Sequence, residues 1–230
     1  MKIIKDQALS VGDYQIETIK SGRWKQNGYL IQHLPSSDLL LIDPGGEENQ
    51  ILKAIENTGG NLRLILLTHA HYDHVGALKP ICDQFDMPFF MHAADRRLLR
   101  QAPLYGASFE KIEIEVPNNP RFLSSEELVW QGEGIQYFHA PGHTPGGVCY
   151  YWKGIAFTGD VLLHKQTIRT DLPGANPEIL KDSITQLLNL LPEDTLMFPG
   201  HGSPWLVREA RKWWKIHSEF PPEYVEESIP

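Results

Sequence analysis

A strand-length apolar run that leads directly into a histidine-rich turn constrains this sequence most. Apart from one arginine, Leu62–Leu67 is apolar, and its length is typical of a buried strand. The chain then continues as Thr68-His69-Ala70-His71-Tyr72-Asp73-His74. The sequence therefore predicts a buried strand whose end carries several side chains that can bind a metal.

Strand and helix patterns alternate around this motif, which favours a layered α/β arrangement with helices covering a sheet. In the first half we predict strands at Asp13–Ile19, Gly28–His33, Leu39–Ile42 and Met87–Met91, and helices at Glu48–Asn57, Leu78–Phe85 and Ala93–Arg100. In the second half we predict strands at Leu128–Trp130, Ile135–His139, Val148–Trp152, Ile155–Thr158 and Thr195–Phe198, and helices at Pro177–Leu190 and Leu206–His217.

The segment Gln101–Pro120 has no clear period, because Pro103, Gly106, Pro117 and Pro120 interrupt it. We expect it to be either a surface connection or a flap that closes over a site.

Size and charge narrow the class of protein further. The chain has 230 residues, which suits one domain over residues 1–217 with a tail at 218–230. Lysine and arginine number 21 against 29 acidic residues, and the resulting net charge of −8 argues against nucleic-acid binding. No apolar stretch reaches membrane-span length, and Met1–Ser10 lacks the apolar core of a signal peptide. We expect a cytoplasmic protein that acts on a small molecule, does not bind membranes, and can form a homodimer. Trp213-Trp214 is expected either to pack in the core or to form a dimer contact.

The histidine-rich turn has the residue types that hold a borderline divalent metal such as zinc. In an extended segment residues i and i+2 project to the same side, so His69 and His71 can share one ion. The following turn can direct Asp73 and His74 toward a second ion.

Three more strand ends carry residues of the same types, which two complete metal sites would need. His143 lies in the loop Ala140-Pro141-Gly142-His143-Thr144-Pro145-Gly146. Asp160 follows Phe157-Thr158-Gly159, and His201 lies in Phe198-Pro199-Gly200-His201-Gly202. We predict that these residues complete the metal-binding set.

These four motifs occur in the same order in the metallo-β-lactamase fold hydrolases, and the sequence resembles that family over residues 13–202. The resemblance implies an α/β fold, the four-layer αββα sandwich, with a two-metal site at one edge of the paired sheets. It also implies the metal ligands, which are His69, His71 and His143 for the first ion, Asp73, His74 and His201 for the second, and Asp160 as a bridge.

The stretch Gly159–Leu163 with Ile168–Asp171 resembles the glyoxalase II branch of that family, and also the persulfide dioxygenases. Glyoxalase II enzymes carry a lysine at the position that matches Arg169, where it helps to hold glutathione. The resemblance therefore implies substrate contacts from Arg169 and Lys165, with a structural ion pair to Asp171 as the alternative for Arg169. Full-length glyoxalase II continues into a helical domain, whereas 29 residues follow His201 here, so the resemblance is to a branch without that domain.

The resemblance implies a dinuclear zinc hydrolase that cleaves a thioester or another activated acyl bond with a hydroxide bridging the metals. Asp73 and Asp160 would be its catalytic residues, and iron or manganese would also suit the ligands. One alternative is a mononuclear iron persulfide dioxygenase using His69, His143 and Asp160. Others are a phosphodiesterase, nuclease or lactonase of the same fold. Antibiotic hydrolysis is not expected, because β-lactamases usually lack the bridging aspartate.

Overall fold

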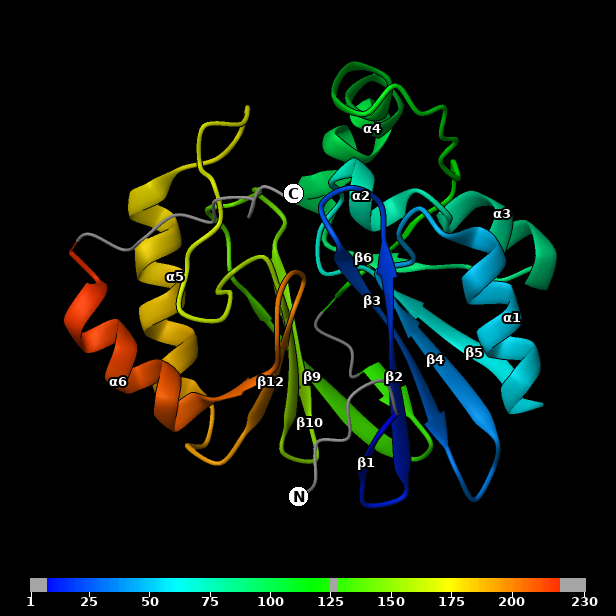
Figure 1. Cartoon of the computed structure of the whole chain (residues 1–230), viewed down its shortest axis with the longest axis horizontal. Helices are drawn as coiled ribbons and strands as arrows, with labels where there is room; N and C mark the ends of the chain where they lie inside the picture. The colour runs from blue at the N-terminus through cyan, green and yellow to red at the C-terminus, as the bar shows by residue number, and fades with distance from the viewer. Residues whose placement is uncertain (1–7, 125–127, 220–230) are drawn as a thin grey trace, which may run out of the picture. The chain divides into compact units, whose positions relative to one another are not determined.

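The structure, a computed structural model, describes residues 8–124 and 128–219, which fall into two compact units. The first unit contains residues 8–91 and 97–122, and the second contains residues 92–96 and the described residues from 123 onward. Each unit has a sheet with helices packed on it (Figure 1). Most of the predicted tail, residues 220–230, lies outside the described residues.

The first unit is built on a seven-stranded sheet whose strands follow chain order. They are β1 (Leu9–Val11), β2 (Tyr14–Ser21), β3 (Gln26–His33), β4 (Asp38–Ile42), β5 (Asn61–Leu66), β6 (Phe90–Met91) and β7 (Arg121–Phe122). The pairs from β1 to β4 are antiparallel, whereas those from β4 to β7 are parallel. Because β4 and β5 are parallel, the segments that follow them leave from the same edge of the sheet.

Helices α1 (Glu48–Thr58), α2 (Tyr72–Val75), α3 (Leu78–Phe85) and α4 (Arg96–Phe109) belong mainly to this unit. Leu39 and Leu41 of β4 pack in one core with Ile51 of α1 and Ile81 of α3, as expected of alternate strand residues facing amphipathic helices. Helix α1 ends at Gly59, which has a φ of 62° and closes the last turn in the left-handed conformation.

The prediction for the segment after Arg100 was wrong over its first half. Helix α4 continues to Phe109 through Pro103 and Gly106 instead of dissolving near Gln101. Its buried face, which includes Leu99 and Ala102, packs into the first unit's core. This burial outweighs the hydrogen bond lost at the proline, so the interpretation as a flap does not hold for residues 101–109. Strand β6 is also shorter than the predicted Met87–Met91.

The second unit is built on a six-stranded sheet in the order β13-β12-β11-β10-β9-β8. Its strands are β8 (Leu128–Trp130), β9 (Glu133–His139), β10 (Val148–Trp152), β11 (Ile155–Gly159), β12 (Leu196–Pro199) and β13 (Trp205–Leu206). Strand β10 is antiparallel to both β9 and β11, and β11 is parallel to β12. Strands β9, β11 and β12 therefore run the same way and end at the same edge of this sheet.

A short 3-10 helix η1 (Ala93–Asp95) and helices α5 (Pro177–Leu190) and α6 (Val207–His217) complete the second unit. Helices α5 and α6 lie side by side and share its core (Figure 1). Adjacent Trp213 and Trp214 are both nearly buried, at 9% and 6% exposure. Trp213 packs edge-on against Trp205, and Trp214 donates a hydrogen bond to Thr185 of α5. Both rings therefore belong to the core of the second unit.

Within the described residues, no helix is long and apolar enough to cross a membrane. The domain boundaries at residues 217 and 218, the homodimer and the cytoplasmic location stay predictions.

Candidate metal centre

In the first unit, the predicted ligands gather where β5 leads into α2. The rings of His69 and His71 meet edge to face with centroids 4.9 Å apart, and those of His69 and His74 lie 4.0 Å apart. Asp73, in the first turn of α2, places Oδ2 3.8 Å from Nε2 of His74. The three histidines are at most 8% exposed. The structure therefore brings all four residues of the motif together.

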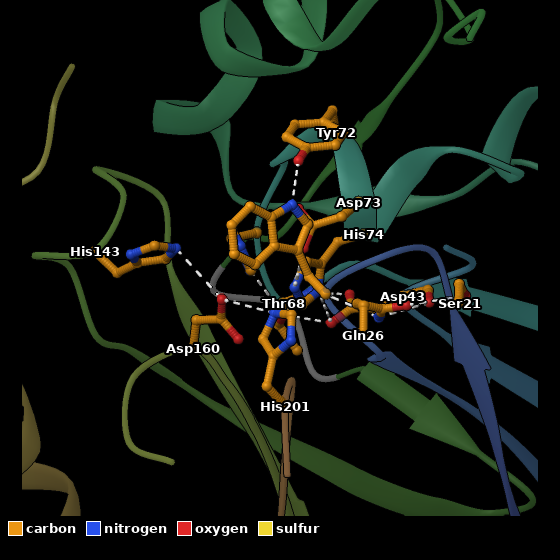
Figure 2. A network of polar contacts seen from close by, with 12 residues as sticks. Ser21, Gln26, Asp43, Thr68, Tyr72, Asp73, His74, His143, Asp160 and His201 are labelled. Atoms are coloured by element: carbon orange, nitrogen blue, oxygen red, sulfur yellow. Dashed lines mark hydrogen bonds and ion pairs between the residues drawn. The ribbon is translucent and has the colours of Figure 1, made fainter. Parts of the chain in front are cut away.

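A buried carboxylate that the sequence analysis did not select supports this cluster. Asp43 directly follows β4, is 1% exposed and has a φ of 49°, which is uncommon for a residue other than glycine. Its Oδ1 accepts a hydrogen bond from the backbone N–H of Thr68 (2.7 Å), and its Oδ2 accepts one from the Thr68 hydroxyl (2.5 Å). The same Oδ2 lies 3.0 Å from Nδ1 of His74 (Figure 2). The signal was present in the sequence, because Asp43 also follows an apolar strand.

These contacts determine which ring nitrogen of His69 and of His74 carries the proton. Nδ1 of His74 faces the Asp43 carboxylate, which can only accept, so Nδ1 carries the proton. Nδ1 of His69 lies 3.2 Å from the Thr68 hydroxyl, which already donates to Asp43 and can therefore accept. In both rings the proton is therefore on Nδ1 and the electron pair is on Nε2, as is usual for histidine ligands of metals.

Tyr72 anchors the short helix that carries Asp73 and His74. Its hydroxyl accepts a hydrogen bond from Nε1 of Trp24 (2.7 Å) and donates one to Glu110 (3.0 Å). Burial, reinforced by the negative charges of Asp73 and Glu110, raises the pKa of this hydroxyl well above its ordinary value. Tyr72 therefore stays protonated and keeps its donor role.

In the second unit, His143, Asp160 and His201 come together at the shared end of β9, β11 and β12. Nε2 of His143 and Nε2 of His201 each lie 3.5 Å from Oδ2 of Asp160 (Figure 2). All three side chains are buried, with exposures between 3% and 5%. The backbone N–H of Gly200 donates to the carbonyl of Gly159 (2.8 Å), which joins the loops carrying His201 and Asp160.

The loop that carries His143 is packed closely against α5. Gly142 has a φ of 131°, and a Cβ there would lie 2.3 Å from the backbone of Leu180, so only glycine fits. Ser183 of α5 donates to the carbonyl of Pro141, and the N–H of Asn176 donates to the carbonyl of Gly142, both at 2.7 Å. The loop approaches the helix backbone closely enough that α5 determines its path.

The donor atoms of this cluster suit a cation. Nδ1 of His143 lies 3.1 Å from the carbonyl of Arg169, to which it must donate, so Nε2 carries the electron pair. That nitrogen then faces the electron-rich Oδ2 of Asp160 across 3.5 Å. Two such atoms repel each other in a buried site unless a positive charge lies between them. Imidazole nitrogens with a carboxylate form a set that zinc, iron and manganese accept.

The two predicted substrate residues lie on the segment after Asp160. Nε and Nη2 of Arg169 donate to the two carboxylate oxygens of Asp171, each at 2.7 Å. These hydrogen bonds lower the pKa of the Asp171 carboxyl to about 2. Lys165 is exposed in the turn between Leu163 and Gln166. The structure therefore contains the ion pair that the sequence analysis gave as the alternative for Arg169.

A comparison with family models found a match over most of the chain. The model described as the metallo-beta-lactamase superfamily matches residues 21–201. This span includes every predicted metal ligand from His69 to His201.

Two curated relatives match along most of their length. The probable metallo-hydrolase YqgX of Bacillus subtilis is 38% identical over 191 residues, which cover 79% of this chain and 87% of YqgX. The hydroxyacylglutathione hydrolase GloC of Haemophilus influenzae is 35% identical over 202 residues, which cover 86% of this chain and 95% of GloC.

Two solved structures share the fold. The BLEG-1 B3 metallo-beta-lactamase superposes with a TM-score of 0.78 at 30% identity, covering 86% of this chain and 96% of BLEG-1. TTHA1623 in a di-iron-bound form superposes with a TM-score of 0.76 at 37% identity, covering 85% of this chain and 97% of TTHA1623.

Proposed function

This chain belongs to the metallo-beta-lactamase superfamily, and from that premise we propose that it is a dinuclear metallo-hydrolase that cleaves thioesters. The fold class predicted from the sequence, the metallo-β-lactamase fold, is confirmed. The orientation of the buried imidazoles carries the proposal, because Nε2 of His143 faces a carboxylate oxygen while Nδ1 is held by a hydrogen bond.

The proposed ligand sets follow the family pattern. His69, His71 and His143 hold one ion, and Asp73, His74 and His201 hold the other. Asp160 would be a ligand of both ions, and its Oδ2 lies 3.5 Å from Nε2 of His143 and from Nε2 of His201. We propose zinc as the metal because histidine predominates in the set, and the di-iron form of TTHA1623 makes iron the alternative to test.

The protein residues orient the reactants around these ions. Bound cations of this kind lower the pKa of a water molecule and stabilise negative charge on a carbonyl oxygen. Asp73 is the most accessible of the first unit's predicted ligands, with 15% of its side chain exposed, so its carboxylate can accept a hydrogen bond from the attacking water. Asp43 keeps the Nδ1 proton on His74 throughout.

The name of GloC, hydroxyacylglutathione hydrolase, supports a thioester as the substrate. That relative matches over 95% of its own length, so it has little room for a helical domain beyond the matched part.

The partners of three arginines in the second unit support broad rather than selective recognition. Arg169 is paired with Asp171, and Arg208 of α6 is paired with Asp194. Arg211 donates to two backbone carbonyls at the end of α5. Because these cations have protein partners, we propose that glutathione thioesters are favoured only modestly over simple thioesters.

The proposal is tested by combining metal analysis with kinetics of Asp160→Asn, which keeps the shape of the side chain but removes its charge. We expect about two metal ions per chain in protein purified without added metal, and hydrolysis of lactoylglutathione. In the variant we expect kcat/KM to fall by roughly 10²- to 10⁴-fold and the metal content to fall below two. Asp182→Asn makes the same change on the exposed face of α5 and serves as the matched control.

Three results would contradict the proposal. Unchanged metal content and rate in Asp160→Asn would remove the bridging role. A single iron with oxygen uptake on glutathione persulfide would point to the dioxygenase instead. Rapid hydrolysis of a β-lactam with no turnover of thioesters would indicate the activity named for BLEG-1.

A further inference from the structure

Asp95 is a buried acidic residue that the sequence analysis did not select and that the proposed ligand set does not use. It lies in η1, directly before α4, and is 1% exposed. The side chain of His92 starts this turn by accepting a hydrogen bond from the N–H of Ala94 (3.4 Å). Burying a carboxylate costs free energy unless it accepts hydrogen bonds. Asp95 therefore requires donors from the surrounding residues.

Both carboxylate oxygens of Asp95 face the loop that carries His143. Oδ1 accepts a hydrogen bond from the backbone N–H of Gly146 at 2.6 Å, and Oδ2 accepts one from the hydroxyl of Thr144 at 2.9 Å. Thr144 is itself 1% exposed. Hydrogen bonds to an ionised acceptor are shorter and stronger than neutral ones, so the carboxylate holds both residues firmly.

The close approach also explains why residue 146 is glycine. A Cβ at Gly146 would lie 2.7 Å from the backbone nitrogen and from Cγ of Asp95. Any side chain would push η1 away from the loop and break the hydrogen bond to Oδ1. The hydrogen bond between Gly146 and the buried carboxylate of Asp95 therefore requires a glycine at position 146.

The contact with Asp95 complements the contact with α5. Helix α5 holds the loop at Pro141 and Gly142, before His143, through Ser183 and Asn176. Asp95 holds it at Thr144 and Gly146, after the histidine. With the backbone fixed on both sides and Nδ1 bonded to the carbonyl of Arg169, the ring can point Nε2 in one direction only.

We infer that Asp95 is a positioning residue for His143, fixing the loop so that Nε2 is held toward Asp160 ready to bind a metal. This inference rests on the proposed function, in which His143 is a ligand of the first ion. Residues that orient metal ligands typically contribute 10- to 100-fold to metal affinity. The effect should fall on the ion that His143 binds and spare the other.

The test is a cobalt(II) titration of the full chain against a competing chelator, followed by visible absorption and carried out without substrate. We expect two equivalents to bind to the unaltered protein. In Asp95→Ala one equivalent should weaken by about 10- to 100-fold while the other binds as before. Asp83→Ala, which removes an exposed aspartate of α3, should leave both equivalents unchanged.

Milder variants keep the test valid if Asp95→Ala folds poorly. Thr144→Val removes one hydroxyl donor at nearly constant volume and should weaken the same equivalent by about 3- to 10-fold. Thr144→Ser retains the hydroxyl and should restore affinity to within about twofold of the unaltered protein. If the role of Asp95 were purely structural, the binding of both equivalents would weaken together. Thr144→Ser and Thr144→Val would then have the same metal affinity.

The possible outcomes test this inference separately from the proposed function on which it rests. If the unaltered protein binds two cobalt ions and cleaves thioesters while Asp95→Ala and Thr144→Val bind both ions normally, the inference is wrong and the proposed function stands. If the unaltered protein fails to bind two ions, both are overturned.

Discussion

The side chain of Arg169 can form either an ion pair with Asp171 or a contact with a substrate. Their two hydrogen bonds are short, yet 43% of the arginine and 67% of the aspartate side chain are exposed. Because solvent screens exposed ion pairs of this kind, they contribute little to folding. Arg169 would nevertheless have to leave Asp171 before it could bind a carboxylate of the substrate. Its measurable signature is the pKa of Asp171, which the arginine lowers to about 2.

We predict that Arg169→Ala returns the pKa of Asp171 to its ordinary value of about 3.9. A carboxyl whose pKa is lowered by folding stabilises the native state above its unfolded pKa. Its contribution is lost as the pH falls from about 4 to about 2, and the variant should lose this dependence. A carboxyl-carbon NMR titration measures the shift, and Lys165→Ala serves as a control that should leave the pKa near 2.

The same variant tests recognition of glutathione. In the unaltered protein we expect kcat/KM for lactoylglutathione to exceed that for a simple thioester of the same acyl group by less than about a hundredfold, or about 2.8 kcal/mol. Arg169→Ala should change this ratio by less than about tenfold. A much larger preference that vanishes in the variant would reveal a dedicated glutathione site.

Helices α4 and α5 show that the same residue type has opposite effects at different positions. Pro103 lies inside α4 and cannot donate the hydrogen bond to Leu99 that an ordinary helical residue would make. Pro177 is in the first turn of α5, where its missing N–H needs no partner, and Asn176 caps this helix by accepting from the N–H of Ile179.

We therefore predict that Pro103→Ala raises the free energy of unfolding by about 1–3 kcal/mol, because alanine restores the hydrogen bond inside α4. The matched control, Pro177→Ala, should change it by no more than about 1 kcal/mol, since only unfolded-state entropy is affected. Chemical denaturation followed by circular dichroism measures both. Loss of stability in Pro103→Ala would show that the packing of α4 requires the bend at its proline.

At the scale of the whole molecule, the proposed ligands come from segments that are far apart in the sequence. His69 and His71 precede His143 and Asp160 by more than 70 residues. Bound ions would then stabilise the native chain through residues far apart in sequence, because an ion that binds only the folded state shifts the folding equilibrium by mass action.

Metal removal should therefore lower the melting temperature. An ion at a thousand times its Kd contributes about 4 kcal/mol, and each kcal/mol shifts the Tm of a chain this size by about 2–4 °C. We expect a chelator to lower the Tm by roughly 8–16 °C and zinc to restore it. Magnesium, which prefers oxygen ligands, is the control that should not. Equal melting temperatures with and without the chelator would argue against tight metal binding.

Local pattern was enough to predict most elements and the proposed ligands. Helix α5 has the predicted bounds, Pro177–Leu190, because its apolar period, first-turn proline and capping asparagine all agree. The proposed ligands could be selected because each follows an apolar strand, and ends of strands that run the same way meet at one edge of a sheet. His143, Asp160 and His201 follow β9, β11 and β12, and the structure brings them together.

Tertiary structure alone decided the features that depend on packing between distant segments. The continuation of α4 through Pro103 depends on burial of Leu99 and Ala102 in the core, which no local propensity contains. The roles of Asp43 and Asp95 depend on partners 25 or more residues away in sequence. A buried carboxylate is identified by the donors that surround it, and those donors are set by the fold rather than by the neighbouring residues in the chain.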